Sequence, residues 1–157
     1  MRAIVRRTVR GTALLCIVAV LACADAHDDV LEVVTSLAAA LTEVSGTGNG
    51  AGHGNLTQFM AAFSKDMPDY GALEKNVAAL LNEGDVSSSI RPLTDSGDDQ
   101  MYKIDLDWLL EVRSLEQDGP ILRRREVVHC ELRKEKKHWK IVALKPLDFF
   151  APAKLGQ

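Results

Sequence analysis

YKIDLDWLLEV, residues 102–112, is the stretch that decides the fold of this chain. Its apolar residues occupy every second position, and most of the residues between them are charged. A period of two is the pattern of a β-strand with one buried face. The stretch is about twice as long as a typical strand of ~5–6 residues. Because strands twist, long strands predict a curled sheet with a concave face.

The residues around this stretch predict three more strands. The alternation returns at 121–134 and at 138–146, and the turn residues Asp118-Gly119-Pro120 separate the first two long strands. A shorter alternating run at 86–90 ends before Pro92, a residue typical of strand ends and edges.

The hairpin between the last two strands has one register in which both faces match. A two-residue turn at 135–136 would place Leu132 beside Trp139 on the buried face. The same register places Glu131 beside Lys140 on the other face. Since apolar pairs and opposite charges both stabilise a sheet, we predict this register.

Three segments before the strands have apolar residues at helical spacing. The first helix is expected at 29–44, and 46–54 (GTGNGAGHG) is expected to be a flexible loop. Asn55 and Asp69 are placed to cap the second and third helices, and Gly84 to end the third. The order predicts an α+β fold, with three helices packed on a strongly curved antiparallel sheet.

Residues 1–26 have the pattern of a signal peptide. A basic start precedes the apolar run 13–21, and cleavage is expected after Ala24 or Ala26. We therefore expect export, to the periplasm or out of the cell. The alternative is a lipoprotein anchored through Cys23, because the four residues ending there resemble a lipobox.

Length and charge limit what the mature protein can be. The chain has 157 residues, which predicts a single domain at 27–152, a tail at 153–157 and no membrane span in the mature form. The leader holds four of the 19 basic residues, so its removal leaves 15 against 22 acidic ones, a net charge of about −7. An acidic domain is poorly suited to nucleic acid.

The sheet sequence contains candidate ligands of a metal, but a simpler interpretation exists. His129 is expected opposite Asp105 or Asp107, and no second histidine completes a metal site. A solvated polar cluster is the favoured interpretation, and we predict no metal and no cofactor. Cys130 lies in an apolar run and is expected to be a small buried residue rather than a nucleophile.

The face opposite the helices should carry apolar residues among charges: Leu109, Val127, Val142 and Leu144. Such a patch predicts a partner surface, most simply that of a homodimer. The alternative is that the C-terminal residues Phe149 and Phe150 cover it.

Two segments carry a family resemblance. WKIVALKPLDFFAP (139–152) resembles the closing strand of SnoaL-like domains, and FMAAF (59–63) with MPDYGALEKNVAALL (67–81) resembles their inner helices. The chain is thus similar to the nuclear-transport-factor-2-like, or cystatin-like, superfamily, and to its exported bacterial members of unassigned function. The resemblance implies a cone that opens between the helices and the concave sheet face. It carries over no catalytic residue.

The resemblance implies which residues would line the cone and bind a ligand there. Trp108, Phe59 and Phe63 would line it for a small apolar ligand, and Arg124 would stand at its rim. The leading hypothesis is an exported ligand-binding or protein-interaction module without catalytic machinery. The alternative is an enzyme of isomerase, dehydratase or cyclase type that uses Glu126 as its acid–base group.

Overall fold

The computed structural model describes residues 14–42, 55–116 and 118–155, with side chains from Ala26 onward. The flexible loop expected at 46–54 lies outside the described residues, as do 1–13 of the expected leader and its Cys23 side chain. The described elements follow in this order: α1 (Leu14–Thr42), α2 (Leu56–Ala61), α3 (Tyr70–Glu83), β1 (Gly84–Gly97), β2 (Met101–Ser114), β3 (Ile121–Glu135), β4 (His138–Lys145) and the short 3-10 helix η1 (Leu147–Phe150).

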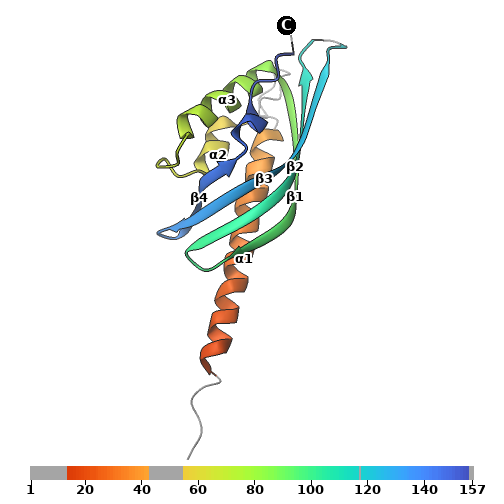
Figure 1. Ribbon diagram of the computed structural model, residues 1–157. Coiled ribbons are helices and arrows are strands. Elements are labelled where there is room, and N and C mark those ends of the chain that lie inside the picture. Colours follow the sequence, from red (N-terminus) through yellow and green to blue (C-terminus); the bar gives the residue numbers. More distant parts are fainter. Residues whose placement is uncertain (1–13, 43–54, 117, 156–157) are drawn as a thin grey trace, which may run out of the picture.

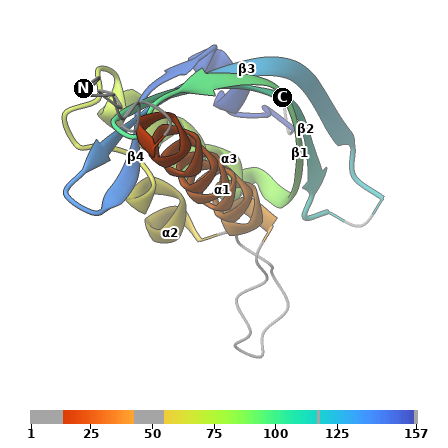
Figure 2. The same cartoon turned by 90° about the horizontal axis from the view of Figure 1, so that it is seen from below.

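The four strands form one antiparallel sheet in the order β1-β2-β3-β4. The sheet curves around α1, and all three helices lie on its concave side (Figures 1 and 2). This confirms the predicted α+β fold of three helices on a curved antiparallel sheet. None of the described helices has the length and apolar content needed to cross a membrane.

Strand β2 supplies the central row of the core. Every apolar residue of the predicted alternation is buried, from Tyr102 to Val112. Of the residues between them, Lys103 is exposed and the other four are partly exposed on the convex side. The period of two therefore determined which face of this strand the helices cover.

Strand β1 is longer than the alternating run at 86–90 indicated. It extends from Gly84 to Gly97, and its pairing with β2 shifts between Pro92 and Thr94. Because β1 is an edge strand, it can accommodate Pro92, which has no N–H to donate to a neighbouring strand.

The predicted register of the last hairpin is wrong. The turn lies at Lys136-Lys137, and Leu132 pairs with Ile141 instead of Trp139. A bulge next to Glu131 then shifts the alternation of β4, so Leu144 is 4% exposed and belongs to the core, not to the outer face. A bulge adds one residue to one strand and reverses the faces beyond it.

The helix caps agree with the sequence at one end and not at another. Asn55 caps α2, and its side chain accepts a hydrogen bond from the Gln58 N–H at 2.9 Å. Asp69 precedes α3 but has φ 65°, in the left-handed region, and makes no side-chain cap. The predicted cap at Asp69 is therefore wrong, because this backbone conformation does not aim the carboxylate at the helix N–H groups.

Candidate functional site

The interior of the curved sheet is centred on Trp108. This side chain is fully buried, and its indole N–H donates to the Ser88 hydroxyl at 2.8 Å. Its ring meets Phe150 edge-on, with centroids 5.2 Å apart, and tilts against Phe149 at 5.9 Å. The one polar atom of the indole is thus satisfied from β1, and its rings pack on Phe149 and Phe150.

The other two aromatics proposed for the cone join the same cluster. Phe59 is fully buried and packs on Phe150 at 5.6 Å and on Phe63 at 5.3 Å. The structure therefore brings the three residues into one cluster, in which Phe150 contacts Trp108 and Phe59, and Phe63 contacts Phe59. The ring of Phe150 occupies the space between Trp108 and Phe59, where an apolar ligand was expected.

Arg124 is half-buried and binds the C-terminal segment of its own chain. Its guanidinium donates to the carbonyl oxygens of Phe149 at 3.0 Å and Pro152 at 2.9 Å, and to that of Ala151. Glu126 pairs with Trp108 in the sheet register but is exposed to solvent. The two polar candidates of β3 therefore have different surroundings, and only Arg124 contacts the aromatic cluster's backbone.

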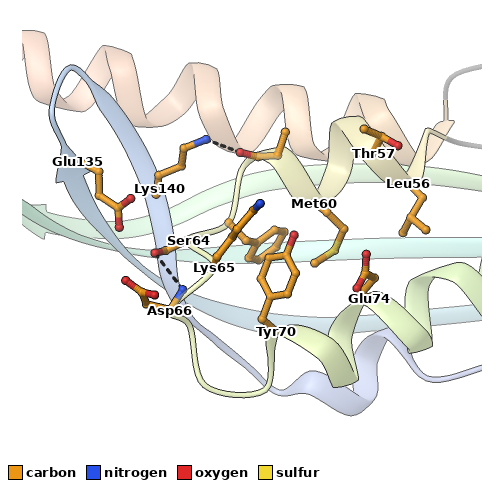
Figure 3. Close-up of a pocket in the computed structure, with 12 residues that line it drawn as sticks. Leu56, Thr57, Met60, Ser64, Lys65, Asp66, Tyr70, Glu74, Glu135 and Lys140 are labelled. Carbon is orange, nitrogen blue, oxygen red and sulfur yellow. Dashed lines mark hydrogen bonds between the residues drawn. The ribbon is translucent and has the colours of Figure 1, made fainter.

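An open pocket of about 610 Å³ lies elsewhere, between α2, α3 and the tip of the β3–β4 hairpin (Figure 3). We call it the α2–α3 pocket. Its apolar lining comes from Leu56, Met60 and Phe63. Polar side chains surround this lining: Thr57, Ser64, Lys65, Asp66, Tyr70, Glu74, Glu135 and Lys140.

Two of these polar groups are already engaged within the protein. The Lys140 ammonium donates to the Ala61 carbonyl, as Figure 3 shows. Arg133 binds the Glu135 carboxylate at 2.8 Å and, with the Ser64 hydroxyl, holds the pKa of Glu135 below its usual value. These side chains form fixed walls of the pocket.

Three other charges have no partner of this kind. Within the described part of the chain, Lys65, Glu74 and the carboxylate of Asp66 take part in no ion pair or side-chain hydrogen bond. Glu74 lies one helical turn after Tyr70 on α3, so both side chains project from the same face. The pocket thus offers one unpaired cation and two unpaired anions beside an apolar surface.

Backbone pairing with β4 positions this pocket. The segment between α2 and α3 runs beside β4, where the Ser64 N–H donates to the Ile141 carbonyl and the Ile141 N–H donates to the Ala62 carbonyl, both at 2.9 Å. Of the residues proposed as ligand-binding, only Phe63 lines the pocket. No sequence pattern marked the other residues of the pocket. Its lining combines residues of α2 and α3 with Glu135 and Lys140, and these distant parts of the chain meet through the pairing with β4.

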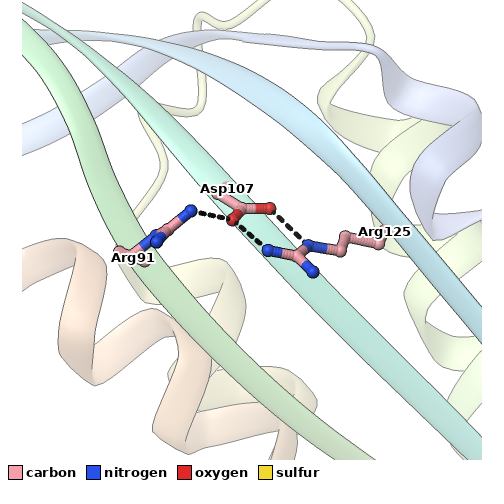
Figure 4. Close-up of polar contacts among 3 residues, drawn as sticks. All are labelled: Arg91, Asp107 and Arg125. Carbon is pink, nitrogen blue, oxygen red and sulfur yellow. Dashed lines mark hydrogen bonds and ion pairs between the residues drawn. The ribbon is translucent and has the colours of Figure 1, made fainter.

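The convex side of the sheet carries cross-strand ion pairs. His129 lies opposite Asp105, with Nδ1 and Oδ1 2.6 Å apart, which decides between the two expected partners. Asp107 instead accepts from Arg91 and from both Nε and a terminal nitrogen of Arg125 (Figure 4). Among the described residues, no three His, Cys, Asp or Glu side chains cluster closely enough to hold a metal ion.

A further polar cluster escaped sequence analysis. His27 Nδ1 lies 2.8 Å from the Asp95 carboxylate, and the Tyr102 hydroxyl donates to the same carboxylate. The Tyr102 hydrogen bond, followed by His27, lowers the pKa of Asp95. The cluster fastens α1 to the β1–β2 hairpin. Its members are up to 75 residues apart, so their spacing gave no signal.

The fold of this protein is similar to that of several solved structures, although its sequence matches no protein-family model and no curated protein. An NTF2-like protein with a cystatin-like fold from Novosphingobium aromaticivorans has TM-score 0.60 and 13% identity, over 85% of this chain and 89% of its own. A second protein of that organism, named as an aromatic ring hydroxylase, has TM-score 0.61 and 11% identity, over 81% and 97%.

A third solved structure is similar at lower score. It is an NTF-2-like protein of unknown function from Shewanella oneidensis, with TM-score 0.52 and 12% identity, over 75% of this chain and 95% of its own. The protein therefore has the nuclear-transport-factor-2-like, cystatin-like fold, as the residues at 139–152 indicated. Identities this low establish the fold and not the activity.

Proposed function

We propose that this protein is an exported binding module that holds a small amphipathic ligand in the α2–α3 pocket without acting on it chemically. The observation that carries the proposal is the pocket itself. Its volume of about 610 Å³ is in the range of small-molecule sites, roughly 300–1,000 Å³. An apolar floor beside unpaired charges suits a ligand with one apolar part and one polar part.

The residues around the pocket suggest how such a ligand would be oriented. Its apolar part would cover Met60 and Phe63, which are buried and lie beneath the opening. Its polar part would reach Lys65 or Glu74, which have no partner of their own within the described chain. Tyr70 supplies a hydroxyl between the two regions.

Native mass spectrometry of the protein, purified gently from its own host, tests the proposal. We expect a retained small molecule that is lost in the Tyr70→Ala and Glu74→Ala variants. Lys75→Ala is the matched control, because Lys75 follows Glu74 on α3, is exposed and does not line the pocket. Retention by all three variants, or a protein that carries no ligand from its host, contradicts the proposal.

Export is part of this proposal and rests on the sequence of residues 1–26. Cell fractionation with mass determination of the mature N-terminus tests it. A start at Asp25 or His27 in the exported fraction supports cleavage by a signal peptidase. A membrane-bound form that becomes soluble in a Cys23→Ser variant supports the lipoprotein alternative instead.

The enzyme alternative has less support. An acid–base group that works in an apolar pocket must be shielded from water, since burial is what shifts a carboxyl toward neutral pH. Glu126 is exposed on β3, and the aromatic interior beside it is filled by Phe149 and Phe150. Catalysis by Glu126 stays a prediction that no contact in the described structure favours.

A further inference from the structure

Two of the rings in the aromatic interior, Phe149 and Phe150, come from the C-terminal segment of the chain. We call residues 147–153 the C-terminal strap. Within it, Phe149 and Phe150 are at most 1% exposed and make ring contacts with Trp108 and Phe59. The two rings also meet each other edge-on at 5.0 Å. The strap fills the concave side at the place where the aromatics of β2 and α2 would otherwise enclose a space.

The strap has few backbone bonds to the rest of the protein. It belongs to no strand, and β4 pairs with β3 only from His129 to Glu135, so the earlier part of β3 has no strand on that side. In that part of β3, Arg124 binds the carbonyls of Phe149, Ala151 and Pro152. A single side chain thus supplies the three hydrogen bonds that hold the strap backbone there.

A second contact is made by the residue that directly follows the strap. The backbone N–H of Lys154 donates to the Glu83 carboxylate at 2.7 Å, on the exposed surface. Because its backbone is held through side chains, the strap can leave without breaking the sheet ladders, and the cost of opening is the exposure of the Phe149 and Phe150 rings. Arg124 and Glu83 are therefore the polar latch of the strap.

The groups that the strap covers specify what could replace it. Trp108 needs no hydrogen-bond acceptor, because its indole N–H already donates to Ser88. The rings around it require an apolar, aromatic body in place of Phe149 and Phe150. Arg124 would lose three carbonyl partners, and a guanidinium favours a carboxylate, which it can bind through two parallel hydrogen bonds.

We propose that the strap is a built-in occupant of a second ligand site, and that an aromatic carboxylic acid displaces it. The aromatic body of the acid takes the place of the Phe149 and Phe150 rings, and its carboxylate takes the place of the carbonyl oxygens on Arg124. This site is separate from the α2–α3 pocket and does not depend on the function proposed there.

Hydrogen exchange and binding by the wild-type protein test the displacement. The probe is 2-naphthoate, with uncharged 2-methylnaphthalene as its comparison. We expect 2-naphthoate to bind more tightly than 2-methylnaphthalene and to speed amide exchange in the strap while β2 stays protected. Failure to bind, or binding that leaves exchange in the strap unchanged, overturns the proposal. The second result would place the probe elsewhere, for example in the α2–α3 pocket.

Two variants separate the roles of the latch. Arg124→Gln should remove the preference for 2-naphthoate over 2-methylnaphthalene, while Arg123→Gln, on the convex face, should retain it. Glu83→Gln weakens the strap and leaves Arg124 intact. Since apparent affinity rises with the fraction of open protein, it should tighten 2-naphthoate binding, by about tenfold for a tenfold larger open fraction.

The variants also keep the proposal open to contradiction. A preference for 2-naphthoate that survives Arg124→Gln overturns it. Should Arg124→Gln fail to fold, Glu83→Gln decides alone. Faster exchange in its strap without tighter binding of 2-naphthoate would show that the strap is structural only.

Discussion

Asp107 on β2 forms ion pairs with the two neighbouring strands on the convex face of the sheet. Its carboxylate accepts from Arg91 at 2.8 Å and from Arg125 at 2.9 and 2.7 Å, across three strands (Figure 4). Arg125, followed by Arg91, lowers the pKa of Asp107 from 3.8 to about 2. Arg125 approaches through two nitrogens in the fork geometry that suits a carboxylate.

The first prediction concerns this ion pair and its pH dependence. A carboxyl whose pKa is lower in the folded protein stabilises it above the unfolded pKa, and that contribution disappears as pH falls through the folded pKa. Asp107→Asn should therefore lower the melting temperature slightly at pH 7, and the difference from wild type should vanish between about pH 4 and pH 2.

Thermal unfolding of both proteins across this pH range is the measurement. Asp99→Asn is the control, because Asp99 is exposed in the β1–β2 turn and makes no ion pair among the described residues. A difference between Asp107→Asn and wild type that persists unchanged at pH 2 would contradict the prediction.

Cys130 illustrates a residue whose surroundings the sequence indicated correctly. It is 1% exposed, and burial, with a smaller effect of Asp105, raises the pKa of its thiol to about 12. Since the thiolate is the nucleophile and the metal ligand, a thiol with this pKa is inert near neutral pH. The apolar neighbours Val128 and Leu132 made this burial readable in advance.

At the scale of elements, the starts of α2 and α3 form a natural contrast. Both follow a residue that favours capping, yet only Asn55 binds a helix N–H. Asp69 takes a left-handed conformation that glycine adopts without strain. The tight connection between Met67 and Tyr70, whose N–H donates to the Met67 carbonyl at 3.2 Å, imposes this conformation.

The second prediction follows from that contrast. Asn55→Ala removes the hydrogen bond to Gln58 and should lower the free energy of unfolding by about 1 kcal/mol. Asp69→Gly removes no cap and relieves the left-handed strain, so it should not destabilise the protein. Urea unfolding of the two variants and of Asn55→Ser, which can restore the cap, is the measurement. Equal destabilisation by Asn55→Ala and Asp69→Gly would count against the assignment.

The β3–β4 hairpin shows what controls a register. The residue pairs of the predicted register, with its turn at 135–136, matched well in the sequence. The observed turn lies one residue later, at Lys136-Lys137, and Lys136 has a positive φ there. The bulge beyond it moves Leu144 into the core and leaves Val142 and Ala143 half-buried. Pairing preferences alone cannot reveal a bulge, because the extra residue on one strand has no partner on the other.

For the whole molecule, the predicted partner surface is smaller than expected. With Leu144 in the core, the predicted residues that remain on the outer face are Val127, which is 42% exposed, and the half-buried Leu109 and Val142. Charged pairs such as Lys103 with Glu131 surround them. The homodimer through this face remains a prediction.

The third prediction tests that homodimer. Sedimentation equilibrium should show twice the mass of one chain for the wild-type protein. Val127→Lys should convert it to a monomer, since a charge at the centre of the patch opposes burial. Leu115→Lys, also exposed but in the β2–β3 connection, should stay dimeric. A wild-type monomer would rule out the outer face as a self-association surface.

Sequence and tertiary structure decided different things about this protein. Local periodicity determined the order of helices and strands and the buried face of β2, because a covered face needs apolar residues at a fixed spacing. The family resemblance, and not the periodicity, implied that Trp108, Phe59 and Phe63 share one interior. Tertiary structure alone decided that Phe150 lies among them, that Arg124 holds the C-terminal strap, and that the open pocket forms beside α3. These outcomes depend on contacts between distant segments, which local spacing does not encode.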